Sequence, residues 1–207
     1  MITLFIDTSS SDVSIAVLKS EVILSSVTKN IPNKHSVYTV RFIEECLEQA
    51  NVTPKDVKRI MVVVGPGSFT GLRIGVTIAK VYSYIEGAQV IPVSSLKMRA
   101  LSVSHDYCLS LIDAHHSHYY IGLYDKDNHE VVKEHFSCKE EVLKLIDKYH
   151  PFIVSDCSGN IDDISYSKQE LDIGKIVEYY QDMESVNPHL VNPNYLKLPQ
   201  ALEDLHD

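Results

Sequence analysis

Apolar and polar positions over the first thirty residues follow the pattern of β-strands. Residues 2–7 (ITLFID) form an apolar run that ends in an acid. Residues 13–18 and 21–27 alternate in polarity, are rich in β-branched side chains and are separated by a Lys-Ser turn. Alternation with a period of two between turn residues is typical of strands. We therefore predict three consecutive strands at the start of the chain.

A change of period marks the next elements. Residues 36–50 predict a helix with Ser36 as its N-cap. One face of this helix collects its apolar side chains, Val37, Val40, Ile43, Leu47 and Ala50. The apolar run 59–64 then predicts a buried strand, the glycine-rich stretch 65–75 leads into a second helix, and residues 89–94 form a further short strand.

The pattern restarts after about residue 103. An apolar run again ends in an acid, Asp113, and is followed by two strand-like segments, an amphipathic helix at 139–149 and a strand at 151–156. The order β-β-β-α-β thus occurs twice. It predicts an α/β protein with an N-terminal domain, residues 1–103, and a smaller C-terminal domain, residues 104–207. The Pro- and Asn-rich tail of the second domain is expected to be extended and to pack on the body.

Composition narrows the class of protein. The chain has 207 residues, of which 44% are hydrophobic and 23% charged, as in ordinary globular proteins. Its formal net charge is −9, and clustered Lys and Arg, which phosphate contacts need, are missing. We therefore expect contact with RNA only through a partner. The sequence predicts neither a membrane helix nor a signal peptide, so we expect a cytoplasmic protein.

Residues that could bind a metal ion are spread along the chain. Four cysteines form no CxxC pair, which indicates buried free thiols: Cys46, Cys108, Cys138 and Cys157. The densest histidine cluster, His115, His116 and His118, opens a strand-like run without a flanking carboxylate. A polar strand edge is the simpler interpretation, and we predict no metal site.

The first acid opens a turn of hydroxyl side chains, Asp7-Thr8-Ser9-Ser10. This is the layout of a phosphate-binding hairpin, in which the carboxylate holds a metal-bound water and the hydroxyls and N–H groups face phosphate. Asp and Ser are also common turn residues, so an ordinary polar turn remains the alternative.

Residues 65–75, GPGSFTGLRIG, hold four glycines between a strand and a helix. Thr70 stands where the Walker A pattern needs its second glycine, no Lys-Ser/Thr pair follows, and Gly71 comes one residue too late for GxGxxG. We therefore predict that these glycines shape a tight turn and admit a neighbouring helix, and that phosphate is not their purpose.

The helix after this loop carries two apolar stripes. One consists of Ile74, Ile78, Val81 and Ile85, and the other of Leu72, Gly75, Ala79 and Tyr82. A helix that is apolar on two faces is buried on two sides, and one side must cover its own sheet. The second stripe has small residues at its centre, which favours a partner helix there. The alternative is that both faces are covered within this chain.

Several segments together resemble the bacterial TsaB family, also called YeaZ. They are residues 6–17, the His35-Ser36 pair, residues 65–75 with 77–80, residues 92–96, Asp113-Ala114 followed by YYIGLY, and NPNYLKLP near the end. GPGSFTGLRIG is the most specific of them. The resemblance covers the whole chain and is dense over its first hundred residues.

The resemblance implies an actin-like, sugar-kinase-type fold of two related β-β-β-α-β-α domains with mixed sheets. It also implies a role in making threonylcarbamoyladenosine next to the anticodon of tRNA, where the transferase TsaD moves the threonylcarbamoyl group to tRNA. Family members are non-catalytic paralogues of TsaD that scaffold and activate it. The implied partners are TsaD in a heterodimer, the ATPase TsaE, and a second copy in a homodimer when TsaD is absent.

The resemblance also places functional residues. The first two helices of the family build the interface with TsaD, and the matching candidates are Val37, Val40, Arg41, Leu72, Arg73, Val76, Ala79 and Lys80. Ala79→Arg is expected to block pairing and to leave the fold intact. Asp7, Thr8, Ser9 and Ser10 match a vestigial nucleotide site. Ala-His-His follows the second carboxylate, Asp113, so half of an ATP clamp is present. We expect no cofactor beyond weak binding of ATP or ADP at a partner interface.

Two other functions stay open. A small-molecule kinase or ATPase of the same fold would use Asp7 to hold a metal ion, with Thr8 to Ser10 on phosphate, although the chain is short for such enzymes. A metalloprotease would need two histidines about one turn apart on one face of a helix, whereas His115, His116 and His118 open a strand-like run. We therefore assign no catalytic residue.

Overall fold

The first sheet has five strands in the order β3-β2-β1-β4-β5 in the computed structural model, which describes residues 1–196. The predicted strands β1 (Ile2–Asp7), β2 (Asp12–Lys19) and β3 (Val22–Asn30) form an antiparallel meander. The strands β4 (Val57–Gly65) and β5 (Gln89–Ser94) add to β1 in parallel. All five predicted strands of this half are therefore confirmed.

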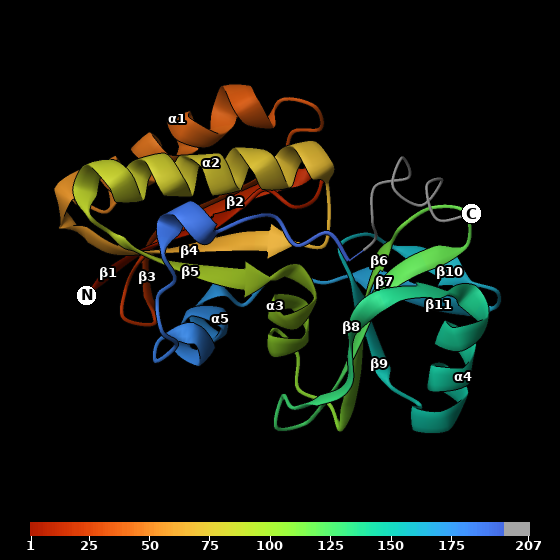
Figure 1. Ribbon diagram of the computed structural model, residues 1–207. Helices are drawn as coiled ribbons and strands as arrows, with labels where there is room; N and C mark the ends of the chain where they lie inside the picture. Colours follow the sequence, from red (N-terminus) through yellow and green to blue (C-terminus); the bar gives the residue numbers. More distant parts are fainter. Residues whose placement is uncertain (197–207) are drawn as a thin grey trace.

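Helices cover both faces of this sheet (Figure 1). The helices α1 (His35–Gln49) and α2 (Phe69–Glu86) pack on the face that carries Leu4 and Ile6. The opposite face, which carries Phe5, is covered by α3 (Ser95–Leu101) and α5 (Ile173–Tyr180). A short 3₁₀ turn, η1 (Pro54–Asp56), precedes β4.

The second sheet has six strands in the order β10-β11-β9-β6-β7-β8. These strands are β6 (Tyr107–Asp113), β7 (His118–Asp125), β8 (Glu130–Cys138), β9 (Phe152–Ser155), β10 (Gly159–Ile161) and β11 (Ile164–Lys168). The helix α4 (Lys139–Tyr149) packs on one face through Val142. The order β8-β7-β6-β9-β11 repeats that of the first sheet, which confirms the predicted repeat and the α/β fold with two mixed sheets.

The repeat is incomplete in its second half. A helix, α2, joins β4 to β5, whereas only the short strand β10 lies between β9 and β11. The second helix expected in the C-terminal domain is therefore absent from that position. The chain instead returns to the first sheet, where α5 packs beside Phe5 and Met61.

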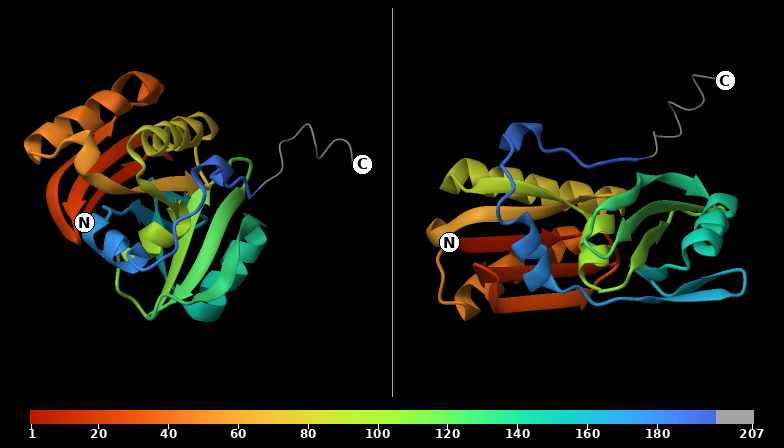
Figure 2. Two further views of the ribbon diagram at one scale, coloured as in Figure 1. Left: turned by 60° about the vertical axis from the view of Figure 1, so that its left-hand side comes forward. Right: turned by 90° about the horizontal axis from the view of Figure 1, so that it is seen from below.

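The segment after α5 runs back along α2 (Figures 1 and 2). It pairs with β5 at Val186, forms the 3₁₀ turn η2 (Pro188–Leu190) and buries Val191 in the first core. The backbone N–H of Asn194 then donates to the Val64 carbonyl at 2.7 Å. This segment, which the sequence assigned to the C-terminal domain, thus packs on the first sheet. The tail packs on the body as predicted as far as residue 196. The last three residues of the NPNYLKLP motif, 197–199, lie outside the described residues.

The helix α3 lies between the two sheets and is buried along all seven of its residues. Met98 faces the first sheet, and Ala100 packs against Cys108, Tyr124 and Val154 of the second. The sequence did not predict this helix, because Lys97 and Arg99 interrupt its apolar pattern. Both charged side chains are nonetheless buried at the joint between the domains.

Candidate functional site

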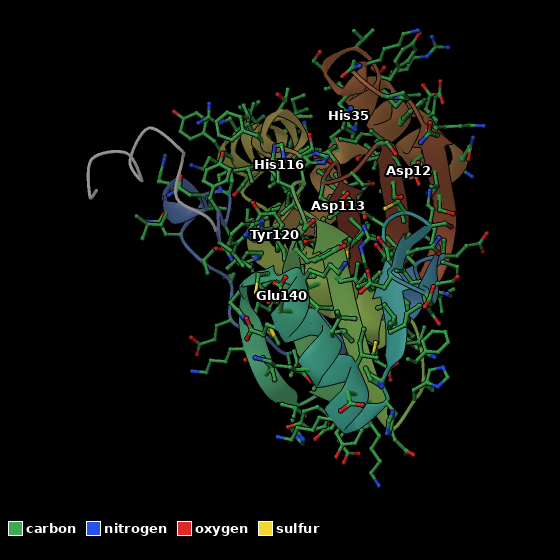
Figure 3. All side chains as sticks on the ribbon, turned by 90° about the vertical axis from the view of Figure 1, so that its right-hand side faces the viewer. Asp12, His35, Asp113, His116, Tyr120 and Glu140 are labelled. Carbon is green, nitrogen blue, oxygen red and sulfur yellow. The ribbon has the colours of Figure 1, made fainter. Side chains whose placement is uncertain are left out.

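A cleft of about 760 Å³ lies between the two domains. It is lined by the turns that follow β1, β4, β6 and β9 and by the first residues of α1 and α2. The ends of the central strands in α/β proteins are common ligand sites, because loops and helix N-termini converge there. His35 of the first domain and Asp113 and Tyr120 of the second line this cleft, and Figure 3 shows them from the side.

The glycine-rich loop packs directly on the turn after β1. The hydroxyl of Thr8 donates to the Gly71 carbonyl at 2.7 Å, and the N–H of Ser68 donates to the Ser9 carbonyl at 2.7 Å. A Cβ atom on Gly71 would collide with the Thr8 carbonyl oxygen, and one on Gly67 with that of Ser9. The predicted tight turn is therefore correct. The neighbour that the glycines admit is this turn and not a partner helix.

Asp7 bonds the turn that the sequence grouped with it but does not line the cleft between the domains. The Asp7 side chain is 2% exposed and lines a second cavity, of about 350 Å³, with Arg99. Its Oδ1 accepts the Ser9 N–H at 2.8 Å. Burial raises the pKa of Asp7, and the charge of Arg99 and the hydrogen bonds from Ser9 partly offset this effect. A buried carboxylate beside a guanidinium is poorly placed to hold a metal-bound water in the cleft.

Asp113 occupies the corresponding place at the end of β6. Its Oδ1 accepts the N–H of His115 at 2.8 Å, as Asp7 accepts that of Ser9. The turn then differs, because His115, His116 and Ser117 all have positive φ angles and exposed side chains. The two carboxylates are thus related by the repeat, but only the first turn is covered by a glycine loop.

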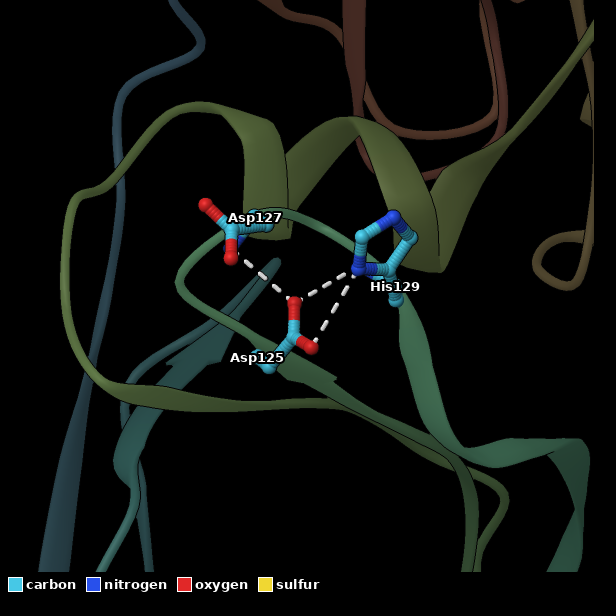
Figure 4. A group of neighbouring side chains, drawn as sticks. All are labelled: Asp125, Asp127 and His129. Atoms are coloured by element: carbon cyan, nitrogen blue, oxygen red, sulfur yellow. Dashed lines mark hydrogen bonds and ion pairs between the residues drawn. The ribbon is translucent and has the colours of Figure 1, made fainter.

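The histidines of this turn do not join any cluster of metal-type ligands. Within residues 1–196, three such ligand atoms lie within 4.8 Å of one another only at Asp125, Asp127 and His129 (Figure 4). These residues form the β7–β8 turn, where Asp125 Oδ1 accepts the N–H groups of Asp127 at 3.0 Å and His129 at 2.8 Å. The hydrogen bond from the His129 backbone is the main cause of a lowered pKa at Asp125. A turn of this kind explains the cluster without an ion.

The outer face of α1 and α2 is apolar and exposed. On α1 the predicted interface residues Val37 and Val40 are 68% and 57% exposed, and Arg41 pairs with Glu45 in solvent. On α2 the exposed apolar side chains are Phe69, Val81, Tyr84 and Ile85. We call these six apolar residues, with Arg73 and Thr77 between them, the outer helical face.

Three predicted interface residues lie elsewhere. Leu72, Val76 and Ala79 are buried at 0%, 3% and 0% exposure. Val76 and Ala79 pack against the first sheet, and Gly75, which precedes Val76, packs on Thr8. The stripe of small residues therefore covers the protein's own sheet, and of the other stripe Val81 and Ile85 are exposed, whereas Ile78 packs against the first core. For the second stripe the sequence left open a partner helix or coverage within the chain, and the structure shows coverage within the chain.

The outer helical face borders two features of this chain. A groove of about 440 Å³ separates α1 from α2, lined by Ser36, Val40, Phe69, Thr70, Arg73, Ile74, Thr77 and Ile78. On the other side, the Arg73 guanidinium stacks 3.8 Å from the centre of the Phe69 ring and donates to the Tyr195 hydroxyl at 3.0 Å. Lys80, another predicted interface residue, donates to the His189 carbonyl at 3.3 Å. The C-terminal segment thus forms one edge of the face.

Comparison with known proteins identifies relatives of this chain. A family model described as TsaD, tRNA N6-adenosine threonylcarbamoyltransferase, matches residues 22–185. The tRNA threonylcarbamoyladenosine biosynthesis protein TsaB of Bacillus subtilis is 30% identical over 97% of this chain and 96% of its own length. TsaB of Buchnera aphidicola is 32% identical over 61% of this chain and 62% of its own length.

Solved structures agree in fold. YeaZ from Pseudomonas aeruginosa superposes with a TM-score of 0.77 at 20% identity, over 94% of this chain and 99% of that one. Within residues 1–196, no helix has the length and apolar character needed to cross a bilayer. The match to TsaB of Bacillus subtilis, which spans nearly the whole chain, shows the family. The chain belongs to the TsaB family of tRNA threonylcarbamoyladenosine biosynthesis proteins.

Proposed function

We propose that this protein is a non-catalytic subunit that docks onto a TsaD-type transferase through the outer helical face and activates it. The observation that carries this proposal is the exposure of large apolar side chains on two adjacent helices, including Tyr84 at 81% and Val37 at 68%. A contiguous apolar patch on a water-facing surface marks an interaction site. We further propose that the ATPase TsaE joins this complex and that the same face pairs two copies of the chain when the transferase is absent.

The geometry of the first turn supports a non-catalytic role. The Thr8 hydroxyl, which would face phosphate in an active enzyme of this fold, donates to the Gly71 carbonyl, and the backbone carbonyl of Ser9 accepts from Ser68 of the glycine loop. Asp7 lines the second cavity beside Arg99. A kinase or ATPase that uses Asp7 is therefore not favoured. We propose that the free chain needs no cofactor and that ATP or ADP binds only weakly, at the partner interface.

A reconstituted transfer assay tests this function. The synthase that makes threonylcarbamoyl-adenylate, the transferase, TsaE, ATP, threonine, bicarbonate and tRNA are combined with and without this chain. Modified tRNA is expected only when the chain is present, and the chain is expected to co-elute with the transferase. Equal modification without the chain would overturn the proposal.

Two matched variants locate the contact. Val81→Asp places a charge on the outer helical face at a site that is 53% exposed, and Val22→Asp places the same charge on β3 at a site that is 59% exposed. Val81→Asp is expected to weaken co-elution and tRNA modification at least tenfold, because the charge would lose its water in an apolar interface. Val22→Asp is expected to leave both unchanged. Equal effects of the two variants would argue against this face.

A further inference from the structure

Arg99 carries a buried charge without a direct partner. It lies on α3 at the joint between the domains, and its side chain is 3% exposed. Within the described part of the chain its guanidinium forms no ion pair, and its Nε has no hydrogen-bond partner. Burial of an unpaired charge is costly, so a guanidinium in this position needs a ligand or ordered water to accept its hydrogen bonds.

Arg99 lines the second cavity, of about 350 Å³, and not the cleft between the domains. The strands β1 to β3 form one wall of this cavity, and residues 168–173 form another. Its uncharged polar lining comes from Ser10, Ser14, Ser26, Thr28 and Gln169, and its apolar lining from Ile23, Leu171 and Ile173. The volume exceeds what one or two water molecules occupy, and it lies within the range of small-molecule sites.

The charges around the cavity fall into two groups. Asp12 is already paired, because it accepts hydrogen bonds from Lys168 and from Asn30. Asp7 and Arg99 are the other two buried ionisable groups, and they form no ion pair with each other, while Glu170 lines the cavity from an exposed position. A buried carboxylate and a buried guanidinium therefore face the same polar cavity without meeting across it.

This pair selects among ligand classes. A phosphate or another simple anion could bind Arg99, but it would also face the carboxylates of Asp7 and Asp12. A simple cation would meet the opposite conflict at Arg99. A small zwitterion satisfies both, because its carboxylate can accept from the guanidinium while its ammonium donates to Asp7.

We propose that the cavity between β1, β2, α3 and residues 168–173 binds a free α-amino acid, with the carboxylate of the ligand on Arg99 and its ammonium on Asp7. The hydroxyls of Ser14 and Ser26 then line the space for its side chain. This site contains no residue of the outer helical face, so the proposal does not depend on the proposed docking to a transferase.

Ligand binding to the unchanged protein provides the first test. Each of the twenty L-α-amino acids is screened by thermal unfolding, and hits are measured by titration calorimetry. At about 100 times its Kd, a true ligand raises Tm by about 5–10 °C for a chain of this size. The corresponding amino-acid amide, which lacks the carboxylate, and the hydroxy acid, which lacks the ammonium, are each expected to bind at least tenfold more weakly.

Other outcomes of this screen are decisive against the proposal. Stabilisation by inorganic phosphate equal to that by the best amino acid would indicate a simple anion site. No stabilisation by any of the twenty would indicate a cavity that holds only water. Because these measurements use the natural chain, they do not depend on whether a variant folds.

Variants then assign the residues. Arg99→Gln and Asp7→Asn are each expected to weaken amino-acid binding at least tenfold, and Arg99→Lys to weaken it less, because it keeps a positive charge. Arg59→Gln is the matched control, since Arg59 also has an unpartnered Nε but does not line the cavity. Loss of binding in the Arg59 variant as well, or retention in a folded Arg99→Gln protein, would overturn the assignment.

Discussion

The hydroxyl of Thr8 donates a 2.7 Å hydrogen bond to the carbonyl oxygen of Gly71, 63 residues further along the chain. A Cβ atom added to Gly75 would lie only 2.5 Å from the oxygen of the same hydroxyl, which is too close. The Thr8 side chain thus connects the turn after β1 to the first turns of α2 and requires a glycine at Gly75, while the backbone carbonyl of Thr8 requires one at Gly71. This contact sets the rotation of α2, and with it the residues that face outward.

Gly71→Ala is expected to destabilise the protein by about 2–3 kcal/mol, because the new methyl group would meet the rigid backbone of Thr8. Urea unfolding measures the effect. Gly87→Ala is the control, since Gly87 has a φ of 70° but open space around it, so only backbone strain of about 1 kcal/mol is expected there. Equal costs at the two positions would show that steric contact with Thr8 is unimportant.

The sequence predicted the strands well, because apolar alternation reports burial directly. It failed at the rotation of α2, since two apolar stripes on a helix do not reveal which one meets the sheet. The small residues Gly75 and Ala79 suggested that a partner helix packs closely against them. In the structure Gly75 instead packs on Thr8, and Ala79 packs on the first sheet. Only the contact between distant segments separates these two interpretations.

The candidate site was predictable to a similar degree. For residues 7–10 the sequence left open a phosphate-binding hairpin or a polar turn, and the structure shows a turn that packs on the glycine loop. That the glycine loop does not bind phosphate stays a prediction. That Asp7 and Arg99 line the same cavity could not be predicted. Arg99 lies on a short helix that carries two charged residues and has no amphipathic pattern. Burial of such a helix between two sheets is a property of the tertiary structure alone.

Ala79→Arg is now expected to unfold the protein rather than to report on pairing. Ala79 is fully buried against the first sheet, so a long cation there would be desolvated and overpacked, at a cost of at least about 3 kcal/mol. Tyr84→Arg, at a site that is 81% exposed, is expected to change stability by less than about 0.5 kcal/mol. Thermal unfolding of the two purified variants checks this. A stable Ala79→Arg protein would contradict the observed rotation of α2.

The ion pair of Asp12 is expected to make stability depend on pH. Burial by itself raises the pKa of Asp12, but hydrogen bonds from Lys168 and Asn30 and the charge of Lys168 outweigh burial and lower it. A carboxyl group with a lowered folded-state pKa stabilises the protein above its unfolded value of about 3.9, and this contribution is lost as the pH falls through the folded value. Asp12→Asn should therefore be less stable than the natural chain at pH 7, and the difference should shrink below about pH 4.

Urea unfolding at several pH values from 7 to 3 measures that difference. Asp106→Asn, at an exposed position, serves as the control and should follow the natural chain at every pH. A gap between Asp12→Asn and the natural chain that stays constant down to pH 3 would rule out a contribution from this carboxylate.

The four cysteines are expected to react at very different rates. Burial raises the pKa of the Cys108 thiol to about 12, so only about one molecule in ten thousand carries the thiolate at pH 8. Cys46 is also buried, whereas Cys157 is exposed beside the cleft, which corrects the expectation that all four thiols are buried. Iodoacetamide labelling at pH 8 followed by peptide mass spectrometry should find Cys157 modified well before Cys108 and Cys46. Early modification of Cys108 would show that the joint between the domains opens readily.

The joint itself depends on Glu134 of β8, which accepts hydrogen bonds from Ser94 at 2.5 Å and from Tyr124 at 2.7 Å. Ser94 belongs to the first domain and caps α3, so this carboxylate ties the second sheet to the first. Tyr124→Phe removes one of the two donors from a part-buried charge and is expected to cost about 1–3 kcal/mol. Tyr107→Phe, on the partly exposed strand β6, should cost less than about 0.5 kcal/mol.

Hydrogen exchange distinguishes a local from a global effect, because faster exchange confined to α3 and β8 in Tyr124→Phe would place the loss at the joint. Unchanged exchange in these two elements would mean that Glu134 does not hold the domains together.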